Sequence, residues 1–416
     1  MATVLRKVSQ QLQNKFKIDI GYFVSGGFFL TLGQGVTVLA SLVTTVVLAN
    51  LLPENDYGFY KYVLGLAVLF TAFSLTGLPF AIQQAAAKGY QKFLYSSVPI
   101  AVVYNFGIFF ISSVGGLYYW FNGNQALAIS CAMIAALQPV VNFYSNTLYY
   151  CYGNSDYRQA SIMHSVKSIS VAIAVISAAL FFDKVLWMVF VYFVTQAFIA
   201  AIFMLLQKPT GGDLPSEQAK KYISYAKNTS LRNVLVKVAT GLDSILIFQI
   251  LGAVELAIYS VSILLVDQVR GTLKNLQTML IPKFSKHESN GILWNIVKFR
   301  TPLLFVVFSF VAVAIFLVAP IFHSLLFPKF EDAILYTQLL ALGIPASVFL
   351  VPLGALRSQR LEKQLYIYDI STSVTQVALL LTLLTSFGLV GVILARVLTQ
   401  WVRAIVAYSL LFSVRK

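Results

Sequence analysis

Apolar runs of about 20 residues recur along the whole of this sequence. A helix of about 20 apolar residues is long enough to cross the hydrocarbon core of a bilayer. A membrane β-barrel would instead show strands of about ten residues that alternate with period two. Only 11% of the residues are charged, whereas a soluble domain has about 25%. The sequence therefore predicts an all-α polytopic membrane protein. We expect twelve transmembrane helices, at 22–50, 57–80, 95–119, 125–152, 160–182, 185–207, 222–251, 256–281, 297–322, 333–356, 365–387 and 390–413.

Loop charge predicts the orientation of these helices. The even-numbered loops and the two termini hold 20 of the 30 basic residues, and the odd-numbered loops hold only Lys184 and Lys329. Basic loops stay on the cytoplasmic side, so we expect both termini in the cytoplasm. The net charge of +15 is interpreted in the same way and does not indicate a nucleic-acid partner. A cytoplasmic linker at 208–221 then separates an N-terminal six-helix bundle, 1–207, from a C-terminal one, 222–416.

The two predicted bundles resemble each other in sequence. A constant offset of 199 aligns Leu52 with Leu251, Asp56 with Glu255 and Tyr60 with Tyr259. Six spans in each half give both halves the same orientation. The repeat therefore predicts a pseudo-two-fold axis along the membrane normal, with a cavity between the halves.

The predicted spans carry charges that lipid alone would not tolerate. A charge at the centre of a spanning helix costs about 2.5–3.5 kcal/mol on insertion scales. Apart from residues near the ends of the spans, the charged residues are Lys167, Arg232, Lys237, Asp243, Asp267, Arg270, Lys274, Asp369, Arg396 and Arg403. Three acids can neutralise three of the seven bases, so about four positive charges remain. They can either bind an anionic ligand or belong to ion pairs that lock helices together.

Helical periodicity groups some of these charges on one face. Arg232 and Asp243 lie within about 20° of each other around their helix, with Lys237 on a neighbouring stripe. Asp267, Arg270 and Lys274 share a face through their i, i+3, i+7 spacing. We expect Arg232, Lys237, Arg270 and Lys274 to bind an anion in the cavity.

The remaining charged residues admit two interpretations each. Lys167 is a further candidate for the anion, although it could also reach toward the cytoplasmic interface. Arg396 and Arg403 either line the cavity or lie partly at an interface. Asp243 and Asp267 could carry a coupling ion or serve as salt-bridge partners.

The N-terminal half is polar with little charge in its spans. Gln34 and Thr37 lie on one face of the first span, and Gln138 and Asn142 on one face of the fourth. Amides and hydroxyls suit the hydroxyl groups of a sugar. Such residues also hold membrane helices together by hydrogen bonds, so both interpretations remain open.

Sequence motifs of enzymes are lacking. There is no HExxH, no phosphate-binding loop, no nucleophile elbow and no His/Cys cluster with metal-ligand spacing. The sequence therefore predicts a protein that is not an enzyme and that uses no metal or cofactor.

Three segments resemble a known family. They are LLPENDYGFYKY at 51–62, TGLPFAIQQAAAK at 76–88 and LDSILIFQILGAVELAIYSVS at 242–262. They are similar to motifs of the polysaccharide-biosynthesis (O-antigen type) flippases, which belong to the superfamily of multidrug, oligosaccharidyl-lipid and polysaccharide exporters. Together with the chain length and the number of spans, the resemblance covers nearly the whole chain.

The resemblance implies a function. Members of this family move an undecaprenyl-pyrophosphate-linked oligosaccharide across the bacterial inner membrane, as part of O-antigen and lipopolysaccharide biosynthesis, by alternating access. It implies that Arg232, Lys237, Arg270 and Lys274 receive the pyrophosphate and that Asp243 is the family's acid on its helix. A polysaccharide polymerase and a chain-length regulator would be partners. The alternatives are a multidrug exporter of the same superfamily, which should have a net acidic cavity, and a membrane glycosyltransferase or polymerase.

Overall fold

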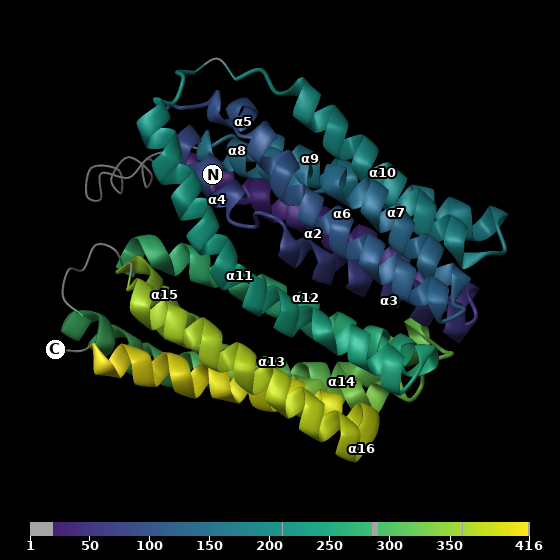
Figure 1. The fold of residues 1–416 in the computed structure, drawn as a ribbon. Coiled ribbons are helices and arrows are strands. Elements are labelled where there is room, and N and C mark those ends of the chain that lie inside the picture. The colour runs from purple at the N-terminus through teal and green to yellow at the C-terminus, as the bar shows by residue number, and fades with distance from the viewer. Residues whose placement is uncertain (1–19, 210, 285–289, 360, 415–416) are drawn as a thin grey trace, which may run out of the picture. The chain divides into compact units, whose positions relative to one another are not determined.

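The computed structural model describes residues 20–209, 211–284, 290–359 and 361–414, with side chains except at 20–28, 30, 274–284, 290–296 and 300. The described residues form helices and no strand (Figure 1). The helices of the first half are α2 (Ile20–Leu51), α3 (Glu54–Phe70), η1 (Thr71–Phe73), α4 (Leu78–Ala87), α5 (Phe93–Ser96), α6 (Val98–Phe121), α7 (Gln125–Val141), α8 (Phe143–Gly153), α9 (Tyr157–Phe181) and α10 (Val185–Leu206). Those of the second half are α11 (Ser216–Ile250), α12 (Ala253–Phe284), α13 (Asn290–Leu326), α14 (Ala333–Ala341), η2 (Pro345–Phe349), α15 (Leu350–Ser358) and α16 (Glu362–Ser413).

The number of spans agrees with the sequence. Ten helical stretches in the described part are long and apolar enough to cross a membrane. One more span is formed by α3 with η1 and by α4, which are bent by 63° at a short break. The long helix α16 is two helices joined at Gly388, whose φ of 58° and ψ of −135° are not helical. Ten stretches, the bent pair and the second part of α16 make twelve, as the apolar runs predict.

Local sequence explains both irregularities. Pro79 lies in the first turn of α4, where its fixed φ suits a helix start and its ring prevents α3 from continuing unbroken. At Gly388 the backbone adopts a positive φ that glycine tolerates without steric cost. The predicted break between 387 and 390 is therefore confirmed.

The described residues form two compact units. Unit 1 comprises the described residues up to Thr44, Phe73–Phe182 and Trp187–Ser230. Its buried core joins α4, α5, α8, α9 and the first turns of α11, through Ile82, Phe93, Tyr144, Met163 and Ala226 among others. The first turns of α11 therefore belong to unit 1, although they follow the linker 208–221.

Unit 2 comprises Thr45–Ala72, Asp183–Leu186 and the described residues from Leu231 onward. Figure 1 shows α15 beside α16 in this unit, and the two helices contact each other. The unit also contains α3, which packs closely against α12. The division at 207 and 222, which was inferred from the linker and the repeat, stays a prediction about the two sequence halves.

Small residues allow the close approach of α3. A Cβ atom on Gly58 would collide with the carbonyl oxygen of Ala253 in α12, and one on Gly65 would lie 2.9 Å from Cβ of Ser244 in α11. Between them, the ring of Tyr62 stacks on that of Phe248 at a centroid distance of 3.9 Å. Small residues at such contacts let membrane helices approach closely.

We predict that Gly58→Ala destabilises unit 2. The added methyl group meets backbone, which cannot rotate away, and overpacking of this kind typically costs about 1–3 kcal/mol. Thermal unfolding of the purified protein in detergent would measure the loss. Gly35→Ala is the matched control, because a Cβ on Gly35 meets nothing within 4 Å. Equal unfolding temperatures for the two variants would contradict the packing described for α3.

Candidate functional site

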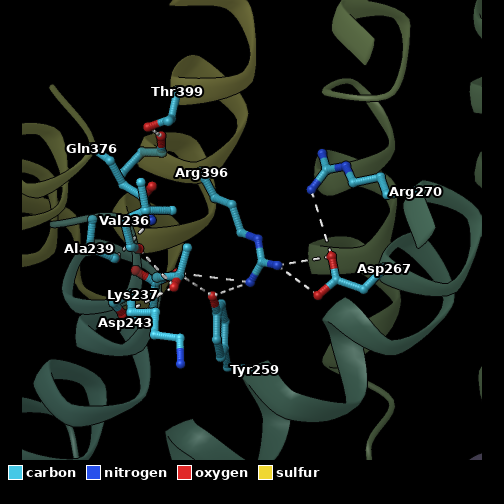
Figure 2. Close-up of polar contacts among 12 residues, drawn as sticks. Val236, Lys237, Ala239, Asp243, Tyr259, Asp267, Arg270, Gln376, Arg396 and Thr399 are labelled. Atoms are coloured by element: carbon cyan, nitrogen blue, oxygen red, sulfur yellow. Dashed lines mark hydrogen bonds and ion pairs between the residues drawn. The ribbon is translucent and has the colours of Figure 1, made fainter. Parts of the chain in front are cut away.

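Arg396 of α16 is the centre of a polar network inside unit 2 (Figure 2). Its Nη2 donates to both carboxylate oxygens of Asp267 in α12, at 2.6 and 2.9 Å. Its Nη1 donates to the hydroxyl of Tyr259, also in α12, at 2.6 Å. Charge-assisted hydrogen bonds through both Nη1 and Nη2 fix the guanidinium in orientation as well as in position.

A second carboxylate shares the same arginine. Asp243 of α11 accepts a hydrogen bond of 2.9 Å from the hydroxyl of Tyr259, and its Oδ2 lies 3.8 Å from Nη1 of Arg396. The tyrosine thus accepts from the arginine and donates to the aspartate. Since Asp243 is only 6% exposed, its charge depends on these partners. The network ties α11, α12 and α16 together.

Arg270 of α12 lies on the other side of Asp267 (Figure 2). Its Nη1 is 3.9 Å from Asp267 Oδ1, and its Nη2 makes a long contact of 3.5 Å with the carbonyl oxygen of Leu340. Among the described atoms, its Nε and Nη1 are buried and have no hydrogen-bond partner. Arg270 is therefore held by charge more than by hydrogen bonds. Its predicted contact with an anion stays a prediction.

Arg403 lines one side of a small cavity between α11 and α16. Its Nη2 donates to Gln376 at 2.9 Å, and Gln376 in turn donates to the carbonyl oxygen of Ala239 at 2.9 Å. The cavity has a volume of about 70 Å³, which is enough room for water. It is lined by Thr240, Asp243, Gln376, Arg396, Thr399, Gln400 and Arg403. No described carboxylate lies within ion-pair distance of Arg403.

The two predicted cations of α11 have different partners. Nε of Arg232 lies 3.2 Å from Oδ2 of Asp369 in α16, although this contact is not aligned as a hydrogen bond. Nζ of Lys237 donates to the hydroxyl of Thr71 at 3.2 Å. Within the described part of the chain, Lys237 has no carboxylate partner. The side chain of Lys274 lies outside the described residues.

The candidates of the N-terminal half lie in unit 1. Nζ of Lys167 lies 4.3 Å from the centre of the Tyr144 ring, and no described carboxylate pairs with it. Asn142 donates to the side chain of Asn105 at 2.8 Å. Thr37 accepts a hydrogen bond of 3.2 Å from Ser168. These bonds join neighbouring helices, so Asn142 and Thr37 act at least in part as connections between helices.

Two further predicted residues of unit 1 lie nearer to the surface. Gln34 is exposed, and Gln138 is partly exposed. Gln34 is therefore the most accessible of these amides, whereas Asn105, which Asn142 contacts, is buried.

The structure gives several residues a larger role in the polar network than the sequence predicted. Arg396 was expected in the cavity or partly at an interface, and it is the arginine that holds both Asp243 and Asp267. Arg396, Gln400 and Arg403 have i, i+4, i+7 spacing, which places them on one helix face. That spacing was the available signal. Nothing in the sequence pointed to Gln376, because an isolated glutamine in a span is common. Tyr259 stood out only as the counterpart of Tyr60 in the repeat, which gave no sign of its contact with Arg396.

Each of the three acids predicted inside the spans lies within ion-pair distance of a base. Asp243 and Asp267 engage Arg396, with Arg270 beside Asp267, and Asp369 engages Arg232. Of the bases predicted inside the spans whose side chains are described, Lys167, Lys237 and Arg403 have no carboxylate within ion-pair distance. Within unit 2, Lys237 and Arg403 are therefore available to an anion, because the acids of the network are engaged in ion pairs.

Comparison with known proteins shows which family model the chain matches and which solved structures resemble it. The family model described as polysaccharide biosynthesis protein matches residues 23–288. None of the curated proteins matches. Among solved structures, a MATE protein in complex with MaD5 has a TM-score of 0.67 at 15% identity and covers 93% of each chain. The inward-facing conformation of a multidrug resistance MATE family transporter of the MOP superfamily has a TM-score of 0.67 at 14% identity and covers 91% of this chain and 94% of that one.

A third solved structure is similar over a comparable length. It is a MOP superfamily transporter from Pyrococcus furiosus, described as having a binding pocket of reverse polarity that suggests a different function. Its TM-score is 0.59 at 13% identity, and the match covers 95% of this chain and 96% of that chain. At these identities the structures show that the fold is that of the MATE transporters.

We predict that Arg396→Met destabilises unit 2 strongly. Removal of one partner from a buried ion pair typically costs about 3–5 kcal/mol. The lower end is expected here, because the Asp267 side chain is 40% exposed. Thermal unfolding in detergent measures the change. The double variant Arg396→Met with Asp267→Asn should recover part of the loss, since it removes one of the two orphaned charges. A single variant as stable as the parent would contradict the network.

Proposed function

Because this chain belongs to the family of polysaccharide biosynthesis proteins, we propose that it is a flippase that moves a lipid-linked oligosaccharide from one leaflet of the membrane to the other. The family and the fold are those of membrane transporters, which are not enzymes. Within that class, the proposal specifies an undecaprenyl-pyrophosphate carrier and the repeat unit of O-antigen or another surface polysaccharide. It places the protein in the bacterial inner membrane with both termini in the cytoplasm.

This proposal rests on positively charged side chains inside the predicted spans that have no carboxylate partner. Lys167, Lys237 and Arg403 have no such partner among the described residues. An unpaired charge in a spanning helix costs about 2.5–3.5 kcal/mol on insertion scales. A substrate with a pyrophosphate group would offset that cost whenever it is bound. A cationic drug would instead add to the positive charge, so the multidrug alternative is disfavoured.

We assign the pyrophosphate first to Lys237. It projects from α11, and its described hydrogen bond is to a neutral hydroxyl group, that of Thr71. Such a bond can be exchanged for one to an anion without orphaning an acid. Arg232 lies five residues earlier on the same helix and would assist, at the cost of weakening its contact with Asp369.

The other predicted cations keep secondary roles in this proposal. Arg270 is buried, and Lys274 follows it by one turn in α12. Lys167 supplies positive charge from unit 1. Arg403 joins the set through its position beside the small cavity. The amides of Gln34 and Gln138 suit the hydroxyl groups of the glycan.

Energy coupling would act through the paired acids. Loss of the Asp267 contact would free the guanidinium of Arg396 to turn toward Asp243 or the substrate. A polysaccharide polymerase and a chain-length regulator are proposed as partners in the same assembly of surface glycan.

The test uses cells that need this protein for their surface glycan. We predict that the double variant Lys237→Met with Arg232→Met reduces surface glycan at least tenfold, because the bound pyrophosphate loses both cations of α11. Gel analysis of extracted glycan measures it, alongside an immunoblot for protein level in the membrane. Lys184→Met, in a loop between spans, is the matched control and should leave the glycan normal. Normal glycan in the double variant would remove the assigned anion site.

A further inference from the structure

Ring side chains in unit 1 form a row that the anion site does not use. The ring of Phe80 in α4 meets that of Tyr149 in α8 edge to face, at a centroid distance of 4.9 Å. Tyr149 meets Tyr152, one turn later, at 5.6 Å. The hydroxyl of Tyr152 then contacts Nε2 of His164 in α9 at 3.1 Å. We call these four residues the ring row.

The ring row differs from the core of the same unit in its exposure. Phe80 is 36% exposed, and Tyr149, Tyr152 and His164 are half-buried. Phe93, a core residue of unit 1, is by comparison 2% exposed. Ligand sites are lined mostly by apolar and aromatic side chains, with a few polar groups that fix the orientation of the ligand. Tyrosine offers both an apolar ring and a hydrogen-bonding tip, which matches the apolar faces and hydroxyl edges of a sugar.

Lys167 lies beside this row, one turn after His164 on α9. It is ten residues from Tyr157, the first residue of the helix, or about 15 Å along it. Its ammonium group lies over the ring of Tyr144, which is only 5% exposed. A cation–π contact is worth about 2 kcal/mol when desolvated, which offsets only part of the cost of the charge.

Accessible aromatic rings beside a lysine without a carboxylate partner suit a ligand that has both a sugar ring and an acidic group. We propose that the ring row binds a sugar chain and that Lys167 binds an acidic group attached to that sugar. The inference rests on the proposed function and adds to it the part of the protein that recognises the glycan. Phosphate and carboxylate groups on a sugar share the chemistry that Lys167 requires.

Binding to the purified full-length protein in lipid nanodiscs tests this inference. The probes are the 1-phosphates of glucose, galactose and N-acetylglucosamine, each beside its free sugar and beside inorganic phosphate. We expect at least one sugar phosphate to bind tenfold more tightly than its sugar or phosphate alone. Lys167→Met should lower its affinity to that of the free sugar, and Tyr149→Leu to that of inorganic phosphate.

A second ring pair provides the matched control. Trp187 and Phe190 of α10 meet edge to face at 6.0 Å in the same unit, and neither has a described contact with a cation. Phe190→Leu should leave binding unchanged. The inference is overturned if no sugar phosphate is preferred, or if Phe190→Leu weakens binding as much as Tyr149→Leu. It is also overturned if Tyr149→Leu alters only stability in the nanodisc, which would indicate an anchor in the lipid headgroups.

Surface glycan in cells separates this inference from the proposed function. If the parent protein binds a sugar phosphate in the expected pattern but does not restore glycan, the flippase proposal fails and the sugar site stands. If Lys167→Met binds the sugar phosphate normally while the parent restores glycan, the sugar site fails and the flippase proposal stands.

Discussion

Unit 2 depends on a single guanidinium shared by two carboxylates. Arg396 binds Asp267 through both oxygens and lies near Asp243, to which it is also connected by the hydroxyl of Tyr259. Charges in a low-dielectric interior are stable only when paired and hydrogen-bonded. The helices that supply these groups, α11, α12 and α16, are therefore held in one rotational setting. That setting places the other polar groups of α11, of α12 and of the part of α16 after Gly388.

The same constraint determines what remains for a ligand. Once the acids of unit 2 are engaged, Lys237 and Arg403 have only neutral partners among the described residues. In water such cations would be unremarkable. At membrane depth they carry a standing cost that an anion can relieve. A transporter benefits from cations that are not fully paired. They supply binding energy for a substrate, and they do not hold it so tightly that it cannot be released.

The sequence predicted the charge surplus but not its distribution. Helical spacing placed Arg232 and Asp243 on one face of α11, and both contact acids or bases of α16 in the structure. The central role of Arg396 was missed, because it lies 153 residues from Asp243 in the chain (396 minus 243). Periodicity reports which residues of one helix share a face. It carries no information about which distant helix that face will meet.

The sequence by itself determined the all-α architecture, the twelve spans, the break at Gly388 and the excess of bases over acids in the spans. These are local properties, because each helix must satisfy its own backbone hydrogen bonds and match the bilayer in length. Only the tertiary structure decided which bases are paired and that α3 packs on α12 within unit 2. Those outcomes depend on the rotation and close approach of helices that are distant in sequence. The physical reason is that the energy of a buried charge depends on atoms within a few ångströms of it, whichever part of the chain supplies them.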